Sequence, residues 1–121
     1  MMRLLVFFFM LLPSLAMPSD QLVDARASLK KWGMTYCLST YQKDDHSKMD
    51  ASLAMGGYFQ MGNHNNEIAY SNVRKFFDVA MKVDQRVSKE NGQPIILMHC
   101  LDAYESPSYK KIISAQDKFL K

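Results

Sequence analysis

The chain has 121 residues, of which 48% are hydrophobic and 22% are charged, and it contains 5 glycines and 4 prolines. This length fits one globular domain and leaves no room for two full ones, and the composition excludes disordered and collagen-like proteins. The formal net charge of +3 is too small to indicate binding to nucleic acid or to acidic lipid.

The N-terminal segment has the features of a secretory signal peptide. Arg3 precedes an unbroken apolar run over residues 4–12, and small residues at Ser14 and Ala16 suit cleavage after Ala16. The alternative is a membrane anchor, but a spanning helix needs about 20 apolar residues and this run ends at Pro13. We therefore predict a cleaved signal peptide over residues 1–16 and a mature domain over residues 17–121, with no membrane contact after cleavage.

The mature chain begins with a helical pattern that Ser19 or Asp20 can cap. Polar residues 43–47 break this pattern, and a second apolar series runs from Met49 until it ends at Gly62. Residues 62–66 then have the composition of a turn. The first helix has apolar residues at three- and four-residue intervals, which is the spacing of one helical face: Leu22, Ala25, Leu29, Trp32 and Tyr36.

Glu67 opens the clearest amphipathic segment, which predicts a helix of about 20 residues. Residues 88–93 interrupt it, and Pro94 suits the first turn of a further helix that carries the apolar run to Leu101. A buried strand over residues 94–101 stays open as an alternative, because the run contains adjacent isoleucines. Pro107, preceded by a serine, marks the start of a last helix, which carries Tyr109, Ile112, Ile113 and Phe119. The apolar face of the amphipathic segment comprises Tyr70, Val73, Phe76, Phe77, Ala80, Val83 and Val87.

The predicted export of the chain favours a disulfide between its two cysteines, Cys37 and Cys100. In an oxidising compartment they pair, and the bridge would close a loop of about 64 residues and add about 4 kcal/mol of stability on the chain-entropy model. The alternative is a reactive thiol at Cys100 with His99 beside it, although neighbours in sequence do not by themselves make a catalytic pair. We expect an all-α fold, a single compact helical domain of about five helices, with one disulfide that joins the first helix to the fourth.

No motif for catalysis, metal binding or cofactor binding is recognisable in the sequence. The histidines His46, His64 and His99 lack the spacing of metal ligands, so we predict neither a metal site nor a cofactor. Acidic residues interleave with the basic ones over residues 67–87, which argues against a nucleic-acid surface. A small exported helical domain of this kind is more typical of a binding protein than of an enzyme. Two alternatives stay open: an enzyme with a site around Cys100, and a periplasmic helical chaperone with exposed methionine and aromatic surface.

A family resemblance adds to this interpretation. Residues 91–106 contain Gly-x-Pro, then Leu-Met-x-Cys-Leu-Asp over residues 97–102, then a tyrosine and a serine. This stretch resembles the C-terminal signature of immunity proteins against type VI secretion amidase effectors. Residues 57–62, with Glu67 and Tyr70 after them, resemble the middle motif of the same family. The similarity is closest to the immunity proteins of the fourth amidase family.

The resemblance implies a periplasmic, all-helical homodimer that neutralises a peptidoglycan amidase delivered by a neighbouring cell. The target would be a Cys-His peptidase of the cell wall, and two effectors would join the dimer in a heterotetramer. Inhibition in this family works by plugging the substrate cleft with a protruding loop, so the chain itself would not be an enzyme.

Two segments are candidates for contact with the effector. The first is the polar loop after the amphipathic segment, where a glycine supplies backbone freedom; it comprises Ser88, Lys89, Glu90, Asn91, Gly92 and Gln93. An ordinary interhelical turn is its alternative interpretation. The second, which the other protomer would offer, is the turn at His64, Asn65, Asn66 and Glu67.

Overall fold

The computed structural model describes residues 19–83 and 86–121, so the expected signal peptide over residues 1–16 lies outside the described residues. In the described part the protein is all-α, with no strand and with a single disulfide, as predicted. The elements in chain order are α1 Ser19–Tyr41, α2 Asp45–Met61, α3 Glu67–Ala80, α4 Ile96–Tyr104, α5 Pro107–Ala115 and the 3-10 helix η1 Gln116–Phe119.

Local capping explains where three of the helices begin. The carboxylate of Asp44 accepts a hydrogen bond from the Ser47 amide (2.9 Å), so α2 begins directly after Asp44. Asn66 caps α3 and Ser106 caps α5 in the same way, and Pro107 occupies the first turn of α5, where its missing N–H costs nothing. The predicted end of the second helix at Gly62 is confirmed.

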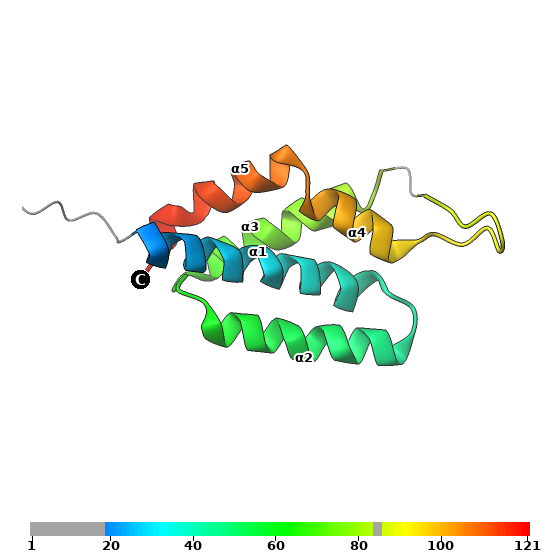
Figure 1. Cartoon of the computed structure of the whole chain (residues 1–121), viewed down its shortest axis with the longest axis horizontal. Coiled ribbons are helices and arrows are strands. Elements are labelled where there is room, and N and C mark those ends of the chain that lie inside the picture. The colour runs from blue at the N-terminus through cyan, green and yellow to red at the C-terminus, as the bar shows by residue number, and fades with distance from the viewer. Residues whose placement is uncertain (1–18, 84–85) are drawn as a thin grey trace, which may run out of the picture.

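Helix α1 lies at the centre and contacts each of the other four α-helices (Figure 1). Helix α2 folds back along it, while α3, α4 and α5 cover its other side. The core is largely aromatic, and Trp32 of α1 meets Tyr70 of α3 edge to face at 4.9 Å. Tyr109 of α5 is fully buried against Phe77 of α3, and its hydroxyl donates a hydrogen bond to the Lys30 carbonyl (2.7 Å).

The prediction for the amphipathic segment was wrong at its end. Helix α3 stops at Ala80, whereas the expected helix of about 20 residues included Val83 and Val87. These two side chains are 61% and 56% exposed, so no described element of the fold covers them. They follow the spacing of a helical face, but a helix persists only where packing supports that face.

The prediction that Pro94 lies in the first turn of a helix was also wrong. Helix α4 begins at Ile96, and Pro94 pairs instead with Val87 in an isolated antiparallel bridge. The alternative of a strand over residues 94–101 is wrong as well, because α4 carries most of that run. Within residues 19–83 and 86–121, no helix is long and apolar enough to cross a membrane.

Candidate functional site

The chain between α3 and α4 forms a hairpin, residues 86–95, that projects beyond the helices (Figure 1). Two backbone hydrogen bonds join its arms: Ile95 N–H donates to the Arg86 carbonyl (2.9 Å), and Ser88 N–H donates to the Gln93 carbonyl (2.8 Å). The predicted effector-binding loop, residues 88–93, forms the tip of this hairpin.

Three residues of the tip shape the turn itself. Ser88 Oγ accepts a hydrogen bond from the Glu90 amide (3.1 Å), and Asn91 Oδ1 accepts one from the Gln93 amide (3.0 Å). Gly92 has a φ of +68°, a conformation that favours glycine, and its amide donates to the Ser88 carbonyl (2.8 Å). The polar groups of Ser88 and Asn91 are therefore used to hold the tip in one conformation.

The side chains of Lys89 and Glu90 are exposed, and within the described residues neither makes a hydrogen bond or an ion pair. Gln93 differs from them, because its Oε1 accepts a hydrogen bond from Lys43 Nζ at 3.5 Å. This bond connects the Gln93 side chain to the turn between α1 and α2. The residues of the predicted loop thus fall into two groups. Ser88, Asn91 and Gln93 make hydrogen bonds within the protein, whereas the charged groups of Lys89 and Glu90 are available to a partner.

The base of the hairpin is fastened to the helices. Cys37 of α1 and Cys100 of α4 form a fully buried disulfide with a Cα–Cα distance of 5.9 Å, which confirms the predicted pairing. Cys100 therefore has no free thiol, and it does not form a nucleophilic pair with His99. Arg86 in one hairpin arm also pairs with Asp102 of α4 (3.3 Å), a contact that the sequence analysis missed.

The second predicted contact lies elsewhere in the protein. Figure 1 places the turn between α2 and α3 at the opposite end of the molecule from the hairpin tip, so the fold of a single chain does not bring the two segments together. The turn pairs with the C-terminal residues, since His64 forms a backbone bridge with Leu120 and the Asn65 amide donates to the Phe119 carbonyl (3.2 Å).

The residues of this turn differ in how far a partner can reach them. His64 is only 4% exposed, and burial lowers its pKa, so the ring is neutral near pH 7. Asn66 is used as the cap of α3, whereas Asn65 and Glu67 are exposed. A pocket of about 220 Å³ lies beside them, lined by Phe59, His64, Asn65, Asn66, Glu67, Tyr70 and Lys121.

The part of the chain that the structure describes holds no group of three or more His, Cys, Asp or Glu residues that could bind a metal ion. A larger, mainly apolar groove of about 600 Å³ lies between α3 and the C-terminal helices. Phe76, Val79 and Ile112 are among its lining residues, and Val79 is 65% exposed.

Comparison with protein families gives one finding. A family model described as "Tai4: Type VI secretion system (T6SS), amidase immunity protein" matches residues 27–113. The match includes both cysteines, the turn between α2 and α3, and the whole hairpin. No curated protein matches the chain.

Proposed function

The chain belongs to the family of type VI secretion amidase immunity proteins, and from this premise we propose that it inhibits a peptidoglycan amidase by inserting its hairpin tip into the active-site cleft. The target is a Cys-His peptidase of the cell wall, and the chain itself is not an enzyme. The protein acts in the periplasm after its signal peptide has been removed.

The observation that carries this proposal is the form of the tip. It projects from the helical body, and its own hydrogen bonds hold it in one conformation before any partner binds. A loop that is ordered in advance loses less conformational entropy on binding, which favours affinity. A loop that protrudes can also enter a concave cleft that a flat helix face cannot reach.

The two free side chains suit a cleft that binds cell-wall stem peptides. A bond between D-glutamate and diaminopimelate lies among carboxylate and ammonium groups, and the cleft of an enzyme that cleaves it must accommodate both charges. Glu90 presents a carboxylate and Lys89 an ammonium group at adjacent positions of the tip. We propose that these two groups occupy the places of the charged groups of the substrate.

We propose further that the protein is a homodimer that binds two effectors in a heterotetramer. Large apolar side chains at exposed positions, including Met49 (66% exposed) and Leu53 (72% exposed) on α2, offer surface to a second copy. The turn at His64, Asn65, Asn66 and Glu67, which is remote from the tip of its own chain, would then be supplied to each effector by the other protomer. Light scattering after size-exclusion chromatography tests this arrangement, and a 1:1 complex would contradict it.

The test of the inhibitory function is co-production of the chain with the cognate amidase in the periplasm, with cell lysis as the readout. The parent chain is expected to prevent lysis. The double variant Lys89→Ala, Glu90→Ala is expected to inhibit the purified amidase at least about 30-fold more weakly, the loss typical of a hot-spot pair worth about 2 kcal/mol.

A matched control removes the same two types of charge elsewhere. Lys111→Ala, Glu105→Ala changes two exposed residues outside the hairpin and is expected to leave inhibition unchanged. Replacement of residues 88–93 by a Gly/Ser linker of equal length is the more severe variant. Full inhibition by the linker variant would refute insertion of the tip, and failure of the parent chain to inhibit any co-encoded amidase would refute the function.

A further inference from the structure

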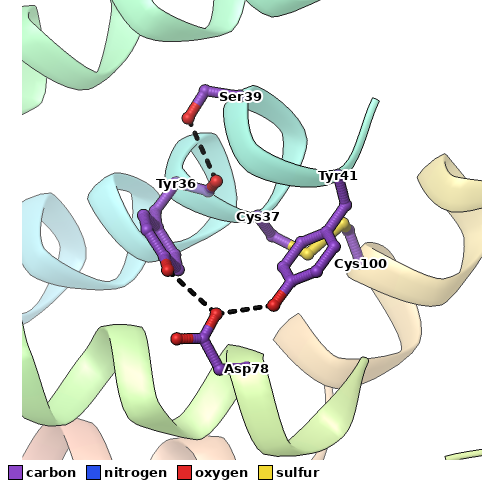
Figure 2. The surroundings of a disulfide bond; sticks show 6 residues. All are labelled: Tyr36, Cys37, Ser39, Tyr41, Asp78 and Cys100. Carbon is purple, nitrogen blue, oxygen red and sulfur yellow. Dashed lines mark hydrogen bonds between the residues drawn. A yellow bond between two sulfur atoms is a disulfide. The ribbon is translucent and has the colours of Figure 1, made fainter. Parts of the chain in front are cut away.

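The C-terminal half of α1 holds both ends of the segment that carries the hairpin. On one side Cys37 is bonded to Cys100 in α4, the helix that follows the hairpin. On the other side the hydroxyls of Tyr36 and Tyr41 both donate to Oδ1 of Asp78, at 2.8 and 2.6 Å, in the last turn of α3. Figure 2 shows the two tyrosine rings converging on this one carboxylate oxygen beside the disulfide.

The carboxylate and the disulfide act on different helices. Asp78 lies close to the end of α3 at Ala80, where the chain leaves the helical body, and Cys100 lies soon after α4 begins at Ile96. The disulfide constrains the outgoing helix but places no direct constraint on α3. The hydrogen bonds to Asp78 link the end of α3 directly to the last turns of α1.

The two hydrogen bonds to Asp78 are of a kind that can hold the end of α3 in a fixed position against α1. Hydrogen bonds from hydroxyl groups to a carboxylate are shorter and stronger than bonds between neutral groups, and two donors on one oxygen fix its position from two directions. Burial, and then the hydrogen bond to Asp78, raise the pKa of both Tyr36 and Tyr41, so both hydroxyls remain protonated donors at neutral pH.

We infer that Asp78 is a positioning residue for the hairpin. With Tyr36 and Tyr41 it fixes the end of α3 while the disulfide fixes α4, so that the tip is presented to a partner in one orientation. This inference rests on the proposed role of the hairpin as the inhibitory element, because an orientation matters only if the hairpin binds.

The first test measures orientation in the absence of the amidase. Residual dipolar couplings of the backbone amides in residues 86–95 and in the helices are recorded for the parent chain and for Asp78→Ala. In the parent chain one alignment tensor should fit both sets. In Asp78→Ala the hairpin couplings should shrink while the helix couplings stay in agreement with the structure. Unchanged hairpin couplings would overturn the inference.

The control removes a polar contact of similar type at a distance from the hairpin. Asp117 accepts hydrogen bonds from the guanidinium of Arg26 and links η1 to α1 near the other end of the molecule. Asp117→Ala should leave the hairpin couplings unchanged. If Asp78→Ala does not fold, Tyr41→Phe removes only one of the two donors and should give a smaller change in the same direction.

The second test measures inhibition of the amidase well below the melting temperature of each variant. If the loosened hairpin occupies the binding orientation about a tenth of the time, the inhibition constant rises about 10-fold. Asp117→Ala should show no such rise. Reduced couplings with unchanged inhibition would show that Asp78 orients the hairpin but that the hairpin is not the inhibitory element, which separates failure of the proposed function from failure of this inference.

Discussion

Gly33 in the middle of α1 gives the most specific prediction about the core. A Cβ atom at this position would overlap the hydroxyl of Tyr109, and it would lie 2.5 Å from Val73 Cγ1 and 2.8 Å from Phe77 Cε2. All three neighbours are fully buried, so none can move aside without displacing others. At Gly33, side chains of α3 and α5 therefore pack directly against the backbone of α1.

Gly33→Ala should therefore destabilise the fold although alanine favours helices. Overpacking of a core typically costs about 1–3 kcal/mol. Displacement of Tyr109 also weakens its hydrogen bond to the Lys30 carbonyl, which adds about 1 kcal/mol. The gain in helix propensity returns about 1 kcal/mol. The net loss of about 1–3 kcal/mol lowers the melting temperature by at least about 4 °C.

The matched control is Gly56→Ala in α2, where the added Cβ meets no atom within 4 Å. This variant should gain about 0.5–1 kcal/mol and melt a few degrees higher than the parent. Thermal unfolding followed by circular dichroism, at one protein concentration for all three proteins, gives the comparison. If Gly33→Ala melted at or above the parent temperature, the close packing of α1 against Tyr109 and Phe77 would be refuted.

Three further predictions concern the covalent, acid-sensitive and capping features of the fold. The double variant Cys37→Ser, Cys100→Ser should lose about 4 kcal/mol in urea unfolding, and equal stability of the parent under reducing and oxidising conditions would contradict this. Burial lowers the pKa of His64 more than Asp117 raises it, so the unfolded chain takes up a proton first and stability should fall as the pH drops below about 6.5. His64→Gln should flatten that part of the curve of unfolding free energy against pH. Ser106→Ala, which removes the cap of α5, should cost about 1 kcal/mol in the same unfolding assay.

Much of the fold could be predicted because its signals are local. The starts of α3 and α5 follow from Asn66 and Ser106, whose side chains bond to backbone amides two or three residues away. The disulfide could be predicted because two cysteines in a chain that is predicted to be exported allow one pairing. The end of α3 could not be predicted, because Val83 and Val87 continue the helical spacing in the sequence. Their exposure becomes apparent only in the tertiary fold.

The position of the hairpin tip could be predicted from its polar composition, but the division of roles within it could not. Whether Asn91 faces a partner or its own backbone depends on the conformation of the turn, which a sequence pattern does not fix. The cluster around Asp78 was missed for a different reason. Its donors, Tyr36 and Tyr41, belong to α1 and are distant from Asp78 in the sequence. Nothing in the pattern of a single helix indicates that they share an acceptor on α3.

The most direct test of the proposed inhibition is the rate at which iodoacetamide alkylates the proposed catalytic cysteine of the cognate amidase in the presence of this protein. Cys37 and Cys100 are joined in a disulfide and do not consume the reagent. If the hairpin tip fills the cleft, the alkylation rate should fall in proportion to the fraction of amidase bound. A fully formed complex in which that cysteine reacts at the rate of the free enzyme would contradict insertion of the hairpin tip into the cleft.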